Sequence, residues 1–265
     1  MNKLLLMNKI FLISLLLVFK YGQECDSGFV WIEDVPSCCG APAEHCFFES
    51  DLSILQHIID NSASTINLLM DDNENGEVEP IELGMTEWVN GRIIALDCYL
   101  SNIMNCNLSG ELPDNFGELD SLEALWLNDN NFSGEIPESF SNLENLELLY
   151  LAGNNFSGMI PESFCELNVN FSGTNNWDVE YFNIENNSLC PPYPTCLDSE
   201  IIGEQSCIDF LGDMNFDSSL NILDIVFIAN LIIQGADYNI LADLNQDNQI
   251  NILDIINLSN IIINN

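Results

Sequence analysis

Oxygen-bearing side chains recur at a fixed spacing near the C-terminal end of the chain. Residues 213–224 read DMNFDSSLNILD, and residues 243–254 repeat the pattern as DLNQDNQINILD, 30 positions later. Asp or Asn stands at positions 1, 3, 5, 9 and 12 of each segment, and a backbone carbonyl at position 7 can complete an oxygen shell for Ca²⁺. The predicted calcium ligands are Asp213, Asn215, Asp217, Ser219, Asn221 and Asp224 in the first loop, and Asp243, Asn245, Asp247, Gln249, Asn251 and Asp254 in the second.

Position 6 of both loops departs from the glycine that calcium loops usually have there. Ser218 occupies it in the first loop and Asn248 in the second. Asn tolerates a left-handed backbone better than Ser does, so we expect the first site to be the weaker one. Apolar helices are predicted to follow at 225–233 and 255–263. The alternative is that both loops are only acidic turns before helices.

The tandem loops resemble a type I dockerin, a module of two F-hand calcium loops, over residues 212–263. The resemblance implies a small all-α domain and a cohesin-like module or cell-surface protein as its partner. It also implies docking through positions 10 and 11, which are Ile222 and Leu223 in one half and Ile252 and Leu253 in the other. Because these pairs are identical, either half could dock. Alternatively, the duplicated helices pack only against each other.

A third loop of the same kind lies at Asp71–Glu82, with the sequence DDNENGEVEPIE. It matches an EF-hand loop, with Glu82 able to supply the bidentate contact. Before it, an amphipathic helix is expected, capped by Ser50 or Asp51. After it, Pro80 is expected to open an exit helix. The predicted ligands are Asp71, Asn73, Asn75, Glu77 through its carbonyl, and Glu82; an acidic turn without metal is the alternative.

The middle of the chain is built from a repeat of 24 residues. The segments that start at Leu122 and Leu146 align without gaps in the frame LxxLxLxxNxFSGxIPxSFxxL, and a degenerate copy precedes them. A period of this length with LxxLxLxxN is typical of leucine-rich repeats. Asn130 and Asn154 are expected to form a buried ladder. The leucines predicted to point inward are Leu122, Leu125, Leu127, Leu146, Leu149 and Leu151.

The SGxIP signature in this frame resembles the plant-type leucine-rich repeat. The resemblance implies an α/β solenoid, a short arc of parallel strands with a binding surface on its concave side. Trp126 and Tyr150 are expected to stack there as an exposed pair, with Glu123 and Glu147 beside them. Aromatic rings flanked by carboxylates suit a sugar or a peptide. The alternative is that both rings pack against an insertion or a cap.

Charge and cysteine content restrict the compartment and the partners. The net charge of −38 becomes −41 without the three lysines that precede residue 21, which excludes nucleic acid as a direct partner. Residues 1–22 are predicted to be a secretory signal peptide, with a membrane anchor as the alternative. The ten cysteines that follow favour disulfides over zinc. Cys190–Cys196 is the first pair we expect, although spacing leaves the connectivity open.

These patterns divide the chain into five parts and favour recognition over catalysis. The chain has two histidines and no GxSxG, HExxH or phosphate-binding motif, so no enzyme activity is expected. It resembles secreted bacterial proteins that join plant-like repeats to a dockerin-like tail. The alternative is an accessory or inhibitor of extracellular polysaccharide-degrading enzymes, such as the plant inhibitors of polygalacturonase. The predicted parts are a signal peptide at 1–22, a Cys-rich cap at 23–92, repeats with a C-terminal cap at 93–198, a linker at 199–211 and the dockerin-like domain at 212–265.

Overall fold

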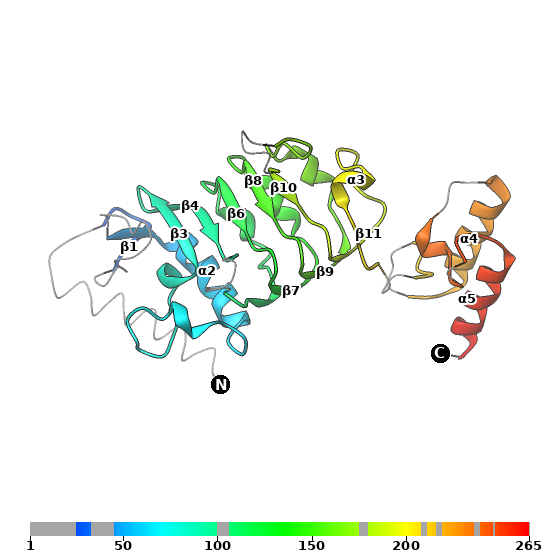
Figure 1. Ribbon diagram of the computed structural model, residues 1–265, viewed down its shortest axis with the longest axis horizontal. Coiled ribbons are helices and arrows are strands. Elements are labelled where there is room, and N and C mark those ends of the chain that lie inside the picture. The colour runs from blue at the N-terminus through cyan, green and yellow to red at the C-terminus, as the bar shows by residue number, and fades with distance from the viewer. Residues whose placement is uncertain are drawn as a thin grey trace.

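The computed structural model describes residues 25–32, 45–99, 106–174, 180–207, 211–215, 219–235, 239–245 and 247–264. The predicted leader at 1–22, Cys38, Cys39 and the proposed ligand Asp217 lie outside these ranges. Figure 1 shows an elongated solenoid of short strands followed by a small helical unit. None of the described helices has the length and hydrophobicity that crossing a bilayer requires.

Two sheets run along the solenoid, and each repeat contributes one strand to both (Figure 1). The LxxLxL segments lie in a five-stranded sheet with the order β10-β8-β6-β4-β3. Its strands are parallel except for β3, which pairs with β4 in the antiparallel direction. The NFSG segments form a four-stranded parallel sheet, in the order β11-β9-β7-β5. The strands are β3 (Met85–Val89), β4 (Arg92–Asp97), β5 (Ser109–Glu111), β6 (Ala124–Trp126), β7 (Asn131–Gly134), β8 (Leu148–Tyr150), β9 (Asn155–Met159), β10 (Phe182–Asn183) and β11 (Ser188–Cys190).

The core between the two sheets is a set of ladders, in which equivalent side chains of successive repeats contact each other. The six leucines predicted to point inward are all fully buried, which confirms the assigned strand register. Phe132 and Phe156 stack with ring centroids 5.9 Å apart. Phe140 stacks on Phe116 at 4.9 Å and on Phe164 at 6.3 Å, beneath the 3₁₀ turns of the outer side. Those turns are Phe116–Glu118, Glu138–Asn142 and Glu162–Glu166.

The N-terminal end of the solenoid is covered by helix α2 (Glu49–Asn61) and an antiparallel pair, β1 (Phe29–Trp31) with β2 (Cys46–Phe48). The expected cap at Ser50 or Asp51 is wrong, because the helix begins at Glu49 after Phe48, which has no side-chain acceptor. Asp51 lies inside the first turn and points into the structure. The expected exit helix after Pro80 is also wrong, since Pro80–Glu82 makes one 3₁₀ turn and the chain enters β3.

Arg92 fastens this cap to the first repeat. Its guanidinium donates to the fully buried Asp51 at 2.9 and 3.1 Å and to the exposed Asp120 at 2.7 Å. It also lies 4.3 Å from the centre of the Phe48 ring. Burial raises the pKa of Asp51, and the hydrogen bonds from Arg92 oppose that rise. The Asp51 carboxylate is therefore stabilised in its charged form mainly by this one arginine.

Replacing Arg92 by methionine is expected to lower the free energy of unfolding by about 3 kcal/mol, because a buried carboxylate loses its counterion. Urea denaturation of the mature chain measures the change. Asp120→Asn removes the exposed partner of the same arginine and should cost less than about 1 kcal/mol. Equal losses from the two substitutions would contradict the role given to Asp51.

All eight cysteines in the described ranges form disulfides. The predicted pair Cys190–Cys196 is wrong. Cys190 ends β11 and pairs with Cys207, whereas Cys196 lies in a loop that folds back onto the turn holding Cys165. Disulfides of this number indicate an oxidising compartment outside the cytosol. The four bridges are Cys25–Cys46, Cys98–Cys106, Cys165–Cys196 and Cys190–Cys207.

The C-terminal unit contains two helices of equal length, α4 (Ile222–Gln234) and α5 (Ile252–Asn264), which pack against each other. Both begin three residues earlier than predicted, because Asn221 and Asn251 cap them by accepting from the N–H groups of Leu223 and Leu253. The other described helical elements are the short helix α3 (Ser199–Ile202) and the 3₁₀ turns Leu68–Met70 and Ile240–Ala242. A small cluster of Leu241 with the Cys190–Cys207 bridge connects this unit to the end of the solenoid.

Candidate functional site

The second C-terminal loop turns its side-chain oxygens inward onto its own backbone. Asp243 accepts from the N–H groups of Asp247 at 3.1 Å and Asn248 at 2.7 Å. Asp254 accepts from Asn245 at 3.3 Å and from Asn251 at 2.8 Å, so it closes the loop from its far end. Asn248 adopts the left-handed conformation with φ of 62°, as its place at position 6 predicts. The loop is thus held in a ring of carboxylate and amide oxygens.

The loop at Asp71–Glu82 makes the same hydrogen bonds at the same positions. Asp71 accepts from Asn75 at 3.1 Å and from Gly76 at 2.7 Å. Glu82 accepts from Asn73 at 3.3 Å and from Glu79 at 3.0 Å. Gly76, at position 6, has a φ of 90°. This loop therefore has the backbone course of the second C-terminal loop, although a strand and not a helix follows it.

The first C-terminal loop is described only at its two ends. Asp224 accepts from the N–H groups of Met214 and Asn221, both at 2.8 Å. This arrangement matches the closing role of Asp254 in the second loop. Positions 4 to 6, including the predicted ligand Asp217, lie outside the described ranges.

The acidic side chains that close the three loops are buried. Asp224 and Asp254 are fully buried and Glu82 almost so, and no lysine or arginine of the described ranges contacts them. Burial raises the pKa of Glu82 to about 7, and the nearby Glu79 carboxyl group adds to the rise, whereas the hydrogen bond from the Glu79 N–H opposes it. Within the described residues, no three His, Cys, Asp or Glu side chains gather into a metal cluster. The predicted calcium ligands are not such a cluster, because many of the oxygens in each loop come from Asn side chains and backbone carbonyls.

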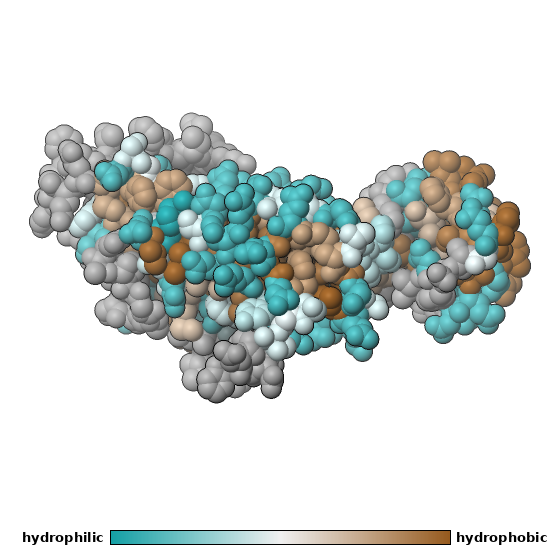
Figure 2. Space-filling view, turned by 90° about the horizontal axis from the view of Figure 1, so that it is seen from above, coloured by the Kyte–Doolittle hydropathy of each residue, from teal (hydrophilic) through white to brown (hydrophobic). Residues whose placement is uncertain are grey.

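Exposed apolar side chains lie at the end of each C-terminal loop, where the helix begins. Ile222 is 70% exposed and Ile252 61%, and Leu223 and Leu253 next to them are about half exposed. Val226, Phe227 and Ile256 extend the same faces along the helices. Figure 2 shows this end of the molecule carrying several apolar groups on its surface. Two equivalent apolar faces therefore lie at the starts of α4 and α5.

The five-stranded sheet brings Trp126 and Tyr150 into register as neighbours on β6 and β8. Both side chains are half-buried, not exposed as expected, and the described ring contacts do not include this pair. The Tyr150 hydroxyl donates to the carbonyl of Glu180 at 2.5 Å, so contact with the cap fixes this ring. Glu123 and Glu147 lie next to each other, since the N–H of Glu147 donates to the carbonyl of Glu123 at 2.8 Å.

Two further residues of this face were missed in the sequence. Asp97 is the register partner of Trp126 on the adjacent strand β4, and Tyr99 follows it by two residues. The repeat that contains β4 is hard to recognise because Cys98 replaces the leucine equivalent to Leu127. Aligning IIALDC with LEALWL would have placed Asp97 beside Trp126.

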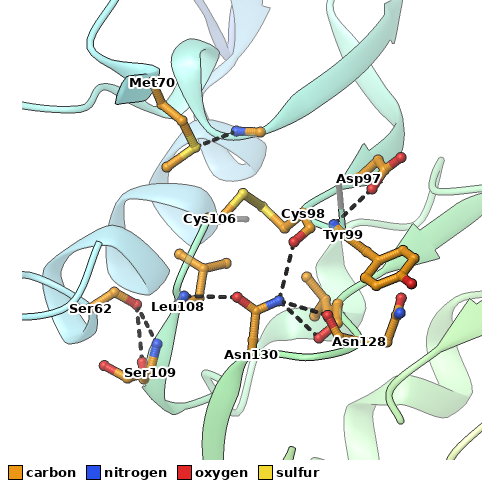
Figure 3. Close-up of a disulfide and its surroundings, with 12 residues drawn as sticks. Ser62, Met70, Asp97, Cys98, Tyr99, Cys106, Leu108, Ser109, Asn128 and Asn130 are labelled. Atoms are coloured by element: carbon orange, nitrogen blue, oxygen red, sulfur yellow. Dashed lines mark hydrogen bonds between the residues drawn. A yellow bond between two sulfur atoms is a disulfide. The ribbon is translucent and has the colours of Figure 1, made fainter. Parts of the chain in front are cut away.

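The buried asparagines on the other side of the strand ends form the predicted ladder. Asn130 accepts from the N–H of Leu108 at 2.8 Å and donates to the carbonyl of Leu127 at 3.0 Å (Figure 3). Asn154 makes the equivalent contacts with Phe132 and Leu151. Asn187 adds a further rung by accepting from Phe156 and donating to Leu151. These residues are structural, because each fills its hydrogen-bonding capacity with backbone groups.

A family model described as Leucine Rich Repeat matches residues 121–143 and 145–167. The structure of PEPR1-AtPEP1 is 24% identical with a TM-score of 0.43, over 56% of this chain but only 19% of that one. The BIR3–SERK2 complex from Arabidopsis thaliana is 23% identical with a TM-score of 0.39, over 58% of this chain and 77% of that one. The ectodomain of the receptor kinase SOBIR1 from Arabidopsis thaliana is 24% identical with a TM-score of 0.36, over 54% and 70%. No relative matches among curated proteins.

The family model covers the two repeats that were aligned from the sequence. Their leucines, phenylalanines and asparagines occupy the ladder positions that a solenoid requires. The chain therefore contains leucine-rich repeats, which form a short solenoid whose repeat strands are parallel in both sheets.

Proposed function

We propose that this chain is an exported, non-enzymatic recognition protein with two binding surfaces. The repeat arc binds a protein on its five-stranded sheet. The C-terminal unit is a dockerin-like module whose two loops bind Ca²⁺ and whose helices dock onto a cohesin-like or cell-surface partner. The observation that supports the docking part is the duplication of an exposed apolar pair at positions 10 and 11 of a loop, directly before the buried carboxylate that closes it.

Calcium fits the donor set of these loops in chemical type. Asp, Asn and backbone carbonyl oxygens are the ligands that Ca²⁺ prefers. A bound cation would also offset the cost of burying Asp224 and Asp254 without a basic side chain nearby. The equivalent hydrogen bonds of the Asp71 loop support calcium there as well, although the exit helix of an EF-hand is absent from that position.

Docking is expected to require one of the two apolar pairs, Ile222–Leu223 or Ile252–Leu253, and either pair should suffice. Ile222→Asp with Leu223→Asp should weaken retention of the full mature chain on an immobilised cohesin module by only about twofold, because the second half remains. The same change in Ile252 and Leu253 should have the same effect. All four substitutions together should weaken retention more than 100-fold. Surface plasmon resonance in calcium, repeated in EGTA, measures each variant.

Leu68 and Leu69 provide the matched control for that experiment, since they are also exposed neighbours but belong to the N-terminal cap. Changing both to Asp should leave retention unchanged. Retention that persists in EGTA, or that survives all four substitutions, would contradict the docking proposal.

An accessory or inhibitor of polysaccharide-degrading enzymes is the second candidate. The half-buried Trp126 lies beside carboxylates, and such surfaces suit sugar rings as well as peptides. Inhibition of a polygalacturonase by the purified chain, lost when Trp126 and Tyr150 are both changed to Ala, would select this candidate.

A further inference from the structure

Four side chains form one patch where β4 meets β6 on the five-stranded sheet. Asp97 and Trp126 are register partners, and the ladder continues with the N–H of Cys98 donating to the carbonyl of Trp126 at 2.9 Å. Tyr99 and Asn128 each lie two residues beyond the ends of these strands, and Figure 3 shows them on the same side of the chain as Asp97. We call Asp97, Tyr99, Trp126 and Asn128 the β4–β6 patch.

Asn128 has a buried acceptor with no hydrogen-bond partner. Its side chain is only 8% exposed, and its Oδ1 accepts no hydrogen bond in the structure. Figure 3 shows its side chain directed toward the side of Tyr99, away from the ladder residue Asn130. A buried acceptor left unsatisfied costs about 1–3 kcal/mol, and such atoms are rare in native proteins. The patch therefore favours a ligand that brings an N–H or O–H donor to this oxygen.

Asp97 adds a negative charge beside that acceptor. Its carboxylate accepts from the N–H of Tyr99 at 2.8 Å, and burial raises its pKa. The described ranges contain one arginine and no lysine, and Arg92 is committed to Asp51 and Asp120. No basic side chain of the described chain thus neutralises Asp97. The patch combines a carboxylate, an unsatisfied amide oxygen and a half-buried indole ring.

We propose that the β4–β6 patch binds an arginine side chain of a partner polypeptide. The guanidinium stacks on Trp126, pairs with the Asp97 carboxylate and donates a further N–H to Oδ1 of Asn128. This inference rests on the proposed function, in which the repeat arc binds a protein, and it specifies the chemistry that the arc recognises.

Arginine suits the patch better than lysine or a sugar. Its planar group has five N–H donors, so it can reach two acceptors while its face lies on a ring. A lysine ammonium is a compact charge that does not stack in this way. A sugar hydroxyl could satisfy Asn128, but it brings no charge to Asp97. Partners with basic segments are also attracted by the strongly acidic surface of the whole chain.

The test uses the isotope-labelled mature chain and two short capped peptides, GSGSRSGSG and the same peptide with citrulline in place of arginine. Citrulline keeps the shape and loses the charge. In NMR titrations the arginine peptide should shift the Trp126 indole and Asn128 amide signals, and it should bind at least tenfold more tightly than the citrulline peptide. Equal binding of the two peptides, or no binding of the arginine peptide, would overturn the inference.

Substitutions in the β4–β6 patch test whether the arginine peptide binds there. Asp97→Asn and Asn128→Leu should each reduce affinity for the arginine peptide at least fivefold. Glu111→Gln removes one charge from β5 in the other sheet and should leave affinity unchanged; an equal loss there would mean that general charge and not the patch attracts the peptide. Shifts of Trp126 by a xylan or pectin oligosaccharide, without any by the arginine peptide, would overturn the arginine site while keeping the arc as a binding surface.

Discussion

Changing Asn154 to alanine is expected to lower the free energy of unfolding by about 4 kcal/mol. The Asn154 amide donates to the carbonyls of Leu127 at 2.9 Å, Leu151 at 3.0 Å and Ala152 at 3.3 Å. Its Oδ1 accepts from the N–H of Phe132 at 3.0 Å. Alanine would leave the N–H of Phe132 without a partner, which costs about 1–3 kcal/mol. The three carbonyls would keep one other donor each, from Asn130, Asn187 and the N–H of Asp129, so each lost bond to Asn154 adds only about 0.5–1 kcal/mol.

The adjacent Asn155 is the matched control, since it has the same side chain in the same repeat but is exposed. Asn155→Ala should change the free energy by less than about 0.5 kcal/mol. Urea denaturation followed by circular dichroism and tryptophan fluorescence measures both variants. Because Asn154 links two repeats through Leu127 and Leu151, its loss should move both signals together. If Asn154→Ala is as mild as Asn155→Ala, the ladder does not contribute as the contacts indicate.

The solenoid could be predicted from the sequence because each repeat requires the same residue types at the same positions. Leu125 and Leu149 occupy equivalent positions, so one correct assignment fixes the other. The same reasoning predicted the ladder at Asn130 and Asn154. The second sheet was not predicted because its strands are short and lack the alternating apolar pattern by which strands are recognised. The strand β7, for example, has the sequence NFSG and ends at Gly134.

Features that depend on contacts between distant segments were predicted less well. Cys190 and Cys196 are close in sequence, yet each pairs with a cysteine from another segment because the chain folds back onto the solenoid. Asp51 was predicted to cap the helix because Asp is common at the N-cap position. Its role as partner of Arg92 depends on a contact 41 residues away. The unsatisfied oxygen of Asn128 has no signature in the sequence at all.

Removing calcium is expected to unfold the C-terminal unit while leaving the repeats folded. Residues 212–265 contain seven acidic and no basic residues, a net charge of −7, which two calcium ions would reduce to −3. The described core of this unit is small, with Ile228, Ala242 and Leu258 buried at its centre. Burial of Asp224 and Asp254 opposes folding unless a cation is present. At a calcium concentration 1000 times the dissociation constant, each site would add about 4 kcal/mol of stability.

Calorimetric titration of the metal-free mature chain should give two or three calcium equivalents, the third at the Asp71 loop. Circular dichroism in EGTA at low salt should lose the helical signal of α4 and α5, and calcium should restore it. Asp224→Asn with Asp254→Asn should remove both C-terminal equivalents, whereas Glu200→Gln with Glu204→Gln removes two charges upstream of the loops and should remove none. A melting curve unchanged by EGTA would mean that the backbone hydrogen bonds of Asp224 and Asp254 suffice to hold the loops. The apolar faces of α4 and α5 would then be presented without any dependence on metal.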